Sequence, residues 1–322
     1  MSTFLVTGAT GQQGGAVVDE LLAAGAKVHA TVRDLSAPKA KALASRGVVL
    51  FQGTHEEPEE VFKAAAKGCV GLFLNVSTFD PATAKKHAAD IIKACKAGAG
   101  STLTSIVLSS TLQVDELIAH ADALVEIHPW IAQYYAAKAG VEAAVRESGI
   151  ANYTILRPPV LHHDYVLPAA ASSHAYYELV KSATLVTSIE DDKTLPYLDA
   201  GDVGKFAAAA LLKPSEFSGH EIALGSENLT ARDIAEIISR VSGIPIKLHR
   251  RTPEEKEASK NTEFFQGFEG IANRFPRKVD VSALEKKYGI KMTTFEEYME
   301  KNKELLLDSL PPRSSAFLEK MA

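Results

Sequence analysis

Residues 5–25 read LVTGATGQQGGAVVDELLAAG, an apolar run followed by a glycine-rich turn and a helical pattern. Gly8, Gly11 and Gly14 stand three residues apart. The start of a helix has unpaired N–H groups and a positive dipole end, and glycines let the backbone approach a pyrophosphate closely. Such glycines also serve ordinary turns, but their place between a strand and a helix favours the binding of a dinucleotide.

The alternation of strand and helix continues outward from this stretch. Strands are predicted at 3–7, 27–32, 48–52, 71–76, 105–109 and 153–157. Helices are predicted at 14–24, 38–46, 58–67, 83–97 and 131–148. The strands are continuously apolar, which is typical of a parallel sheet covered by helices on both faces. The pattern predicts an α/β fold, a doubly wound parallel-sheet Rossmann domain with a smaller C-terminal α+β domain.

After residues 157–159 the predicted strands and helices become shorter. We expect the Rossmann domain to span residues 1–158 and to receive parts of about 196–225, with the smaller domain over 159–322 and partly interleaved. A helix is expected to begin near Asp202, and another at Thr230, with Asp233 three residues on. The C-terminal tail is Pro/Ser-rich with an apolar end, so it is either packed on a neighbour or loosely ordered.

Composition narrows the class of protein. The chain has 322 residues, 46% hydrophobic and 23% charged, and a formal net charge of -5. This mild acidity gives no electrostatic reason to expect a nucleic acid or an anionic membrane as partner. Cys69 and Cys95 are expected to be buried, reduced thiols. Without a signal-peptide pattern or a long apolar span, the expected location is the cytoplasm.

The second predicted strand ends in HATVRD, residues 29–34, which bears on the choice of dinucleotide. An acidic residue at this strand end would accept hydrogen bonds from a ribose diol. The guanidinium of Arg33 suits a 2′-phosphate instead, which favours NADP over NAD. The alternative is a solvated surface arginine beside Asp34.

Several segments together resemble the NmrA-like group of atypical short-chain dehydrogenases/reductases. They are TGATGQQGG (7–15), VHATVRD (28–34), SIVLSS (105–110), YYAAKAGVEAAVRESGIANYTILRP (134–158) and LPYLDAGDVGKFAAAALL (195–212). The resemblance extends over roughly the first 250 residues. It implies an NADP-binding Rossmann domain, a smaller C-terminal substrate domain and a cleft between them. Some members of the group are reductases, and others look like redox-sensing regulators that bind NADP without turning it over. Thr54 stands where many members carry an acidic residue near the adenine.

A pair of residues on the last predicted helix has the spacing used for proton chemistry. Short-chain reductases supply a proton from a tyrosine, assisted by a lysine one helical turn away, and Tyr134 and Lys138 have this spacing. The lysine lowers the pKa of the phenol by its charge and also holds the nicotinamide ribose. Alternatively, Tyr134 or Tyr135 only packs the helix on its neighbour, and Lys138 itself polarises or protonates the substrate.

A third polar group is expected after the fifth strand, where it would hold the carbonyl oxygen. Ser109, Ser110 and Thr111 follow one another there, and strand alternation makes Ser109 and Thr111 face one way and Ser110 the other. Thr111, or else Ser110, is the candidate.

The leading hypothesis is an NADPH-dependent oxidoreductase that reduces a carbonyl, C=C or C=N bond of a small molecule. Lys138 and Tyr134 would do the proton chemistry, and Asn75 and Val76 would flank the adenosine or ribose. The residues expected to hold the pyrophosphate are Gly8, Thr10, Gly11, Gln13 and Gly14. The alternative is a non-catalytic NADP(H)-binding redox sensor that acts through a protein partner.

Aromatic and histidine residues outside these motifs are weaker signals. No metal site is predicted, because His162 and His163 in an extended segment would point to opposite sides. One of them is either a substrate contact or a surface residue. Trp130 is expected to pack structurally, and Tyr176 and Tyr177 to lie in the core or to line a pocket.

Overall fold

The computed structural model describes residues 1–56, 58–76, 78–172, 176–259 and 265–321. The chain forms two compact units that are interleaved in sequence. The N-terminal unit consists of Met1–Ala119, Gln133–Pro158 and Ala200–Ala223. The C-terminal unit consists of His120–Ala132, Pro159–Asp199 and Leu224–Ala322.

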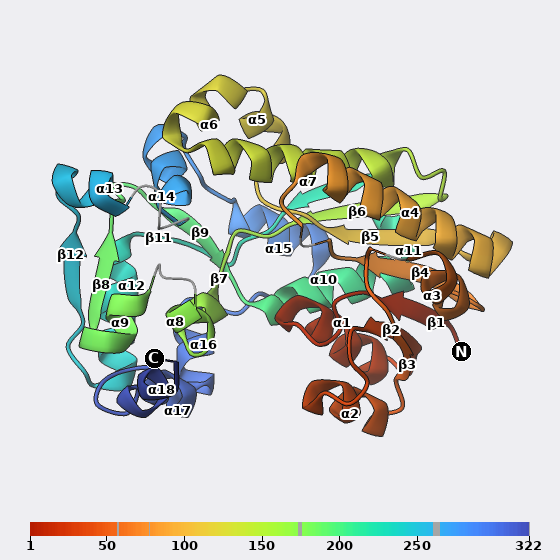
Figure 1. Ribbon diagram of the computed structural model, residues 1–322, viewed down its shortest axis with the longest axis horizontal. Helices are drawn as coiled ribbons and strands as arrows, with labels where there is room; N and C mark the ends of the chain where they lie inside the picture. Colours follow the sequence, from red (N-terminus) through yellow and green to blue (C-terminus); the bar gives the residue numbers. More distant parts are fainter. Residues whose placement is uncertain (57, 77, 173–175, 260–264, 322) are drawn as a thin grey trace. The chain divides into compact units, whose positions relative to one another are not determined.

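A sheet of seven parallel strands forms the centre of the N-terminal unit, in the order β10-β6-β5-β4-β1-β2-β3 (Figure 1). The strands are β1 Thr3–Val6, β2 Lys27–Val32, β3 Val49–Gln52, β4 Cys69–Leu74, β5 Ser105–Ser109, β6 Asn152–Arg157 and β10 His220–Ala223. The chain runs from β1 outward to β3, then returns to the other side of β1 through β4. The predicted α/β class with a Rossmann-like parallel sheet is confirmed, and the switch point lies between β1 and β4.

Helices cover both faces of this sheet, as the apolar strands require. The helical segments of this unit are α1 Gln12–Ala23, α2 Pro38–Ser45, α3 Pro58–Ala65, α4 Pro81–Ala99, η1 Gly100–Thr102, α5 Val114–Ile118, α7 Pro129–Arg146 (whose first turn belongs to the C-terminal unit), α10 Ala200–Leu212 and α11 Pro214–Phe217. Figure 1 shows α4 and α7 on one face, and α1 and α10 on the other. Fully buried side chains such as Phe62, Ile91 and Val145 fill the layer between the sheet and α3, α4 and α7.

The edge strand β3 is more exposed than expected, and the helices α1 and α10 pack closely on each other. The edge strand β3 is not buried on both faces, and Val49 is 50% exposed, because an edge strand has only one neighbour. Gly204 in α10 lies against α1, and a Cβ there would come within 2.7 Å of the backbone carbon and oxygen of Ala16. The two helices pack closely because this position carries no side chain.

The C-terminal unit combines short strands with many helices. Its strands are β7 Val160–Leu161, β8 Thr184–Thr187, β9 Leu195–Leu198, β11 Glu227–Leu229 and β12 Lys247–Arg250, and they form one sheet in the order β11-β9-β7 and a pair β12-β8. Its helical segments are α6 Ala121–Ile127, η2 His162–Tyr165, α8 Ala169–Ser172, α9 Tyr177–Ser182, α12 Ala231–Ser242, α13 Pro253–Ser259, α14 Phe265–Arg274, α15 Val281–Tyr288, α16 Phe295–Lys301, α17 Lys303–Asp308 and α18 Ser315–Met321. The predicted helix start at Thr230 is confirmed, because Thr230 and Asp233 form a reciprocal capping box.

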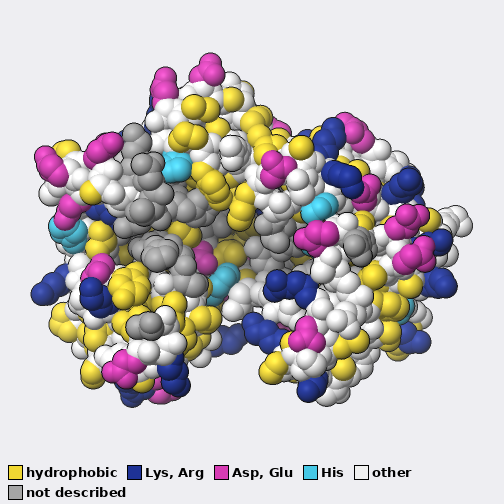
Figure 2. Space-filling model, viewed as in Figure 1, with side chains coloured by type: hydrophobic (Ala, Val, Ile, Leu, Met, Phe, Trp, Pro, Cys, Tyr) yellow, Lys and Arg dark blue, Asp and Glu magenta, His cyan; other side chains and the backbone are white. Residues whose placement is uncertain are grey.

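The surface carries both signs of charge. Lys and Arg side chains are interspersed with Asp and Glu over the face shown in Figure 2, in keeping with the small net charge. In the described parts of the chain, no helix combines the length and the apolarity needed to cross a bilayer.

Candidate active site

The carboxyl ends of β1 and β4 meet at the switch point of the sheet, where open α/β sheets bind ligands. The backbone N–H of Thr7 donates to the carbonyl of Phe73 over 3.0 Å. The hydroxyl of Thr7 in turn accepts a hydrogen bond of 2.7 Å from the N–H of Asn75. The predicted residue Asn75 is therefore fixed beside the start of the glycine turn.

Each of the three glycines in this turn has a different structural role. Gly8 has a φ of +64°, a conformation that favours glycine, and its carbonyl accepts a 2.9 Å hydrogen bond from the N–H of Gly11. Gly11 is the N-cap of α1, and its backbone is exposed. Gly14 is buried, and a Cβ on it would lie 2.3 Å from the carbonyl oxygen of Gly8. Gly14 thus allows the helix to pack on the turn, while Gly8 and Gly11 shape its exposed rim.

The N-terminus of α1 fits an anionic group. No side chain among the described residues caps it, and its first turn contains no acidic residue. The unpaired N–H groups and the positive end of the helix dipole therefore remain available to a ligand. Thr10 lies on the same turn and is partly buried.

The two serines at the end of β5, Ser109 and Ser110, point to opposite faces of the sheet, as strand alternation predicts. The hydroxyl of Ser109 donates to Oε1 of Gln13 in α1 over 2.5 Å. The hydroxyl of Ser110 donates to Oε1 of Glu142 in α7 over 2.6 Å. Thr111 follows with 7% of its surface exposed. The hydroxyl proton of Ser110 is therefore used in the hydrogen bond to Glu142.

Arg33 is exposed just after β2, and its carbonyl accepts a hydrogen bond of 3.2 Å from Nε2 of Gln52. The carboxylate of the neighbouring Asp34 accepts hydrogen bonds from both the N–H and the hydroxyl of Ser36, each 2.7 Å long. These bonds lower the pKa of Asp34. Among the residues that the structure describes, Arg33 forms no ion pair, so its guanidinium is not neutralised by Asp34.

On α7, Tyr134 and Lys138 lie on one face. The ammonium of Lys138 is 5.7 Å from the centre of the Tyr134 ring, and Nζ donates to the carbonyl of Val76 over 3.4 Å. The structure therefore brings Val76, two residues after β4, together with the helical pair. Burial lowers the pKa of Lys138 to about 8, an effect that the charge of Glu142 opposes.

The two adjacent tyrosines have different environments. Tyr135 is fully buried and packs edge-to-face on Tyr134, with ring centres 5.2 Å apart. Tyr134 is only half-buried, and its ring also contacts Phe79 at 5.8 Å between centres. Phe79 is 43% exposed, and the sequence reasoning missed it. The sequence could have indicated Phe79 by its place in the loop that follows β4, a strand that ends at the switch point.

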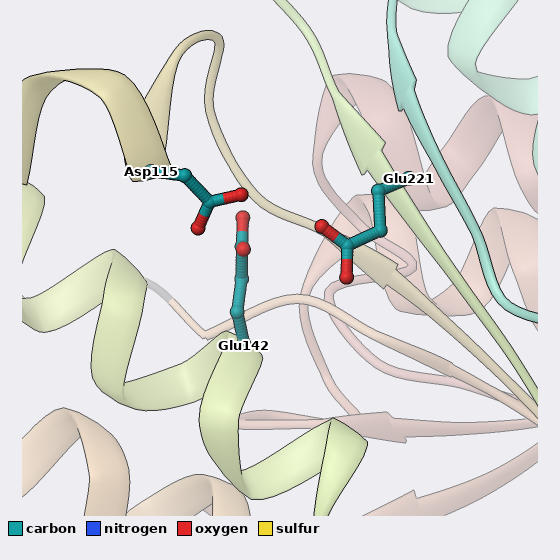
Figure 3. A group of neighbouring side chains, drawn as sticks. All are labelled: Asp115, Glu142 and Glu221. Carbon is teal, nitrogen blue, oxygen red and sulfur yellow. The ribbon is translucent and has the colours of Figure 1, made fainter.

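A network of ions lies one helical turn beyond Lys138. Figure 3 shows the carboxylates of Asp115 from α5, Glu142 from α7 and Glu221 from β10 converging. Nη2 of Arg157 contacts all three, at 2.6, 2.7 and 2.7 Å. Arg146 pairs with Glu142 at 2.8 Å and with Glu221 at 2.7 Å. Both guanidiniums pair with these three carboxylates, so the cluster is an ion-pair network that ties α5, α7, β6 and β10 together.

The histidines after β6 are not in an extended segment, and that expectation is wrong. His162 begins the short 3₁₀ helix η2, is fully buried, and packs edge-on against Phe295 and Tyr298, with ring centres 5.3 and 5.5 Å apart. Neither ring nitrogen has a hydrogen-bond partner among the described residues. Burial, with a smaller contribution from His163, lowers the pKa of His162 to about 3. His162 is therefore a neutral core residue.

The strand order and the glycine turn at the switch point define a Rossmann-like α/β protein. The profile of the NmrA-like family matches residues 1–299. The chain belongs to the NmrA-like family, which confirms the resemblance seen in its motifs.

Named relatives include reductases and a regulator. The NAD(P)H azoreductase of Xenophilus azovorans is 28% identical over 251 residues, 78% of each chain. The Citrobacter sp. triphenylmethane reductase, solved in complex with NADP(H), superposes with a TM-score of 0.71 at 22% identity, over 94% of this chain and 99% of that one. The negative transcriptional regulator NmrA superposes with a TM-score of 0.74 at 19% identity, over 96% and 99%. A further structure of NmrA is a complex with NADP.

Proposed function

We propose that this protein is an NADPH-dependent oxidoreductase that reduces a carbonyl, C=C or C=N bond of a small molecule. The observation that carries the proposal is the position of Lys138, whose ammonium donates to the carbonyl of Val76 just after β4 and lies beside the ring of Tyr134. A half-buried cation at the switch point, beside a phenol on the same helix face, is the arrangement that carbonyl reduction needs.

The residues of the switch point fit a dinucleotide. The uncapped start of α1 suits a pyrophosphate, which the turn of Gly8, Thr10, Gly11, Gln13 and Gly14 would hold. Asn75 and Val76 would flank the ribose, and Lys138 would donate to its hydroxyls. Arg33 would hold the 2′-phosphate through paired, charge-assisted hydrogen bonds.

Bound NADPH would supply a hydride to the carbon of the reduced bond. Tyr134 would donate a proton to the other atom of that bond, the oxygen, the nitrogen or the second carbon, so that a ketone, for example, becomes an alcohol. Lys138 would ease the loss of that proton, because a nearby positive charge stabilises the phenolate. Thr111 would hold the substrate oxygen in place, since Ser110 is bonded to Glu142.

The named relatives support a small-molecule reductase. One relative is named an NAD(P)H azoreductase, and one similar structure is a triphenylmethane reductase complexed with NADP(H). Both are reductases associated with a nicotinamide cofactor, which supports the reduction of a small molecule by this chain.

A second candidate function is an NADP(H)-binding redox sensor that acts through a protein partner. It is favoured by one observation, the similarity in fold to the regulator NmrA, which also binds NADP. A sensor would need the same cofactor residues but no proton donor. The role of Tyr134 therefore separates the two functions.

Tyr134→Phe tests the proposed role directly, because it removes one hydroxyl and keeps the ring. We expect turnover to fall by about a hundredfold, the usual range for a lost general acid, while NADPH affinity stays near that of the wild type. Lys138→Met should lower both turnover and affinity. Steady-state kinetics and NADPH titration measure the two effects.

Tyr135→Phe is the matched control, since it removes a hydroxyl from the neighbouring, fully buried ring. Its turnover should stay close to that of the wild type. Equal turnover for Tyr134→Phe and Tyr135→Phe would contradict the assignment of the proton donor to Tyr134.

A further inference from the structure

A hydrogen bond between Gln13 and Ser109 joins two elements that are far apart in the sequence. Gln13 is the second residue of α1, directly after the glycine turn, and Ser109 is the last residue of β5. In the sheet, β4 lies between β5 and β1, the strand that leads into the turn. The side chain of Gln13 therefore reaches from the start of α1 to the end of β5, across the carboxyl end of β4. This is the edge of the sheet at which the switch point lies.

The bond to Ser109 fixes the direction of the Gln13 carboxamide. The hydroxyl of Ser109 donates to Oε1 of Gln13 over 2.5 Å. Ser109 is only 3% exposed, and within the described parts of the chain its hydroxyl bonds to no other group. If the amide were turned round, the buried proton of this hydroxyl would have no acceptor, which is costly. The carbonyl end of the carboxamide therefore faces β5.

The NH2 end of the same carboxamide is left for another acceptor. An amide side chain has one acceptor oxygen and a nitrogen with two N–H donors. Ser109 uses the oxygen, whereas Nε2 of Gln13 has no hydrogen-bond partner among the residues that the structure describes. Gln13 is half-buried, so a ligand at the turn can reach the exposed part of its side chain.

The surroundings of this NH2 group favour an anionic acceptor. The first turn of α1 has backbone N–H groups without helical partners, and it contains no acidic residue. A hydrogen bond from an N–H to an anionic oxygen is stronger than one to a neutral oxygen. A pyrophosphate offers several such oxygens, so it matches both the backbone donors and the side-chain donor of Gln13.

We propose that Ser109 is a positioning residue of the cofactor site, which holds the Gln13 carboxamide so that Nε2 donates to a pyrophosphate oxygen of the dinucleotide. Gln13 makes the contact, and Ser109 acts only through Gln13. The inference rests on the proposed cofactor site at the glycine turn, and it adds a residue from a strand two places away in the sheet. Neither residue transfers a proton, so an enzyme and a sensor would use them in the same way.

The experiment titrates the full-length protein with NADPH and, separately, with ADP-ribose, which has the pyrophosphate but neither the nicotinamide nor the 2′-phosphate. Calorimetry gives both affinities. Gln13→Ala removes the donor and should weaken both ligands by about tenfold, the equivalent of about 1.4 kcal/mol. Ser109→Ala keeps the donor but lets the amide rotate, so it should weaken both by about fivefold. Ser109→Thr retains the hydroxyl and should bind within about twofold of the wild type.

The double variant separates positioning from a general loss of structure. If Ser109 acts only through Gln13, removing Ser109 has no further effect once the carboxamide is gone. The protein with both Gln13→Ala and Ser109→Ala should therefore bind about tenfold more weakly than the wild type, as Gln13→Ala does alone. Two independent effects would instead multiply to about fiftyfold.

Ser105→Ala is the matched control. Ser105 is the first residue of β5, four positions before Ser109 and on the same face of the strand, and it is also 3% exposed. Its hydroxyl donates to the carbonyl of Val70 over 3.4 Å, away from the glycine turn. This variant should bind both ligands like the wild type. Thermal unfolding checks that every variant is folded.

NMR spectroscopy reports the position of the carboxamide directly. The side-chain NH2 signals of Gln13 are assigned by their loss in Gln13→Ala. In the wild type they should differ from those of a solvated glutamine and shift when ADP-ribose binds. In Ser109→Ala without ligand they should move to the values of a solvated glutamine.

Wild-type affinity for both ligands in Ser109→Ala would overturn the inference, as would a fiftyfold loss in the double variant. A loss that appears with NADPH but not with ADP-ribose would also overturn it, because the donor would then not face the pyrophosphate. A wild-type protein that binds neither ligand would overturn the proposed cofactor site as well, so the two failures give different results.

Discussion

Arg33 is the single side chain on which we propose that the choice of cofactor depends. It is exposed after β2, and its acidic neighbour is occupied by Ser36. We expect Arg33→Asp to weaken NADPH binding by about 2–4 kcal/mol, because a charge-assisted pair is lost and a repulsion is added. NADH binding should change much less. Titration of both cofactors into both proteins measures the difference.

Arg46→Asp provides the control for the change in charge. Arg46 lies at the end of α2 and pairs with Asp19 at the surface. This variant should keep the NADPH affinity of the wild type. Equal losses for NADPH and NADH in Arg33→Asp would show that Arg33 does not contact the 2′-phosphate.

His162 makes the stability of the protein depend on pH. Its pKa is about 3 in the folded chain and about 6.5 when exposed, so the unfolded chain binds more protons between these values. Stability therefore falls as the pH drops below about 6.5, by about 1.4 kcal/mol for each pH unit. From pH 7 to pH 5 we expect a loss of about 2 kcal/mol from this residue.

His162→Phe should remove that part of the loss, because a phenyl ring keeps the aromatic packing and binds no proton. Denaturant unfolding at the two pH values measures it. His249→Phe, at an exposed position, should retain most of the wild-type loss. The same pH dependence in His162→Phe as in the wild type would refute this account.

Some individual residues could be predicted from the sequence and others could not. The spacing of Tyr134 and Lys138 fixes their shared helix face, since it depends only on local geometry. The partner of Ser110 could not be predicted, because Glu142 is 32 residues away and meets it only when α7 packs on the sheet. His162 was expected in an extended segment, because local composition does not reveal a buried 3₁₀ turn.

At the scale of elements, we expect two glycines at the start of α1 to serve different purposes. Gly11 would leave room for a ligand, and Gly14 lets the helix pack on the turn. Gly11 is exposed, and a Cβ there would lie 3.3 Å from the carbonyl oxygen of Gly8, a contact that a small shift relieves. Gly11→Ala should leave the fold near native stability and weaken NADPH binding by about tenfold or more, because the methyl group stands where the pyrophosphate approaches.

Gly14→Ala is the matched substitution three residues further on. Its Cβ would lie 2.3 Å from a backbone oxygen, so we expect a loss of stability of about 1–3 kcal/mol or more. Thermal unfolding and NADPH titration of both variants separate the effects. A folded Gly11→Ala protein with wild-type NADPH affinity would contradict the placing of the phosphates at this turn.

The elements of the first half were predicted within two residues of their observed ends. Long apolar strands and helices bounded by Gly, Pro and capping residues carry a strong local signal. The short helices α5 and α6 were missed, because seven residues or fewer give too little periodicity. The exposed face of β3 was missed because edge position is a property of the whole sheet.

At the scale of the whole molecule, the alternation of strands and helices determines the topology of the N-terminal unit. In the C-terminal unit, residues from segments between Val160 and Glu269 line one pocket, and the local sequence pattern does not show that these segments meet. Tyr176 was expected in the core or in a pocket, and it lines one. The ion pair of Arg251 with Glu269 could not be predicted either, because the fold brings together residues that are 18 positions apart in the chain.

The central claim is that the protein transfers hydride from NADPH to a small molecule. The most direct measurement mixes the wild-type protein with NADPH and a panel of ketones, aldehydes, quinones and imines, and follows the absorbance of the reduced nicotinamide together with product. We predict substrate-dependent loss of that absorbance, with one product formed for each NADPH consumed. Tight binding of NADPH without consumption on any member of the panel would contradict the claim and favour the sensor.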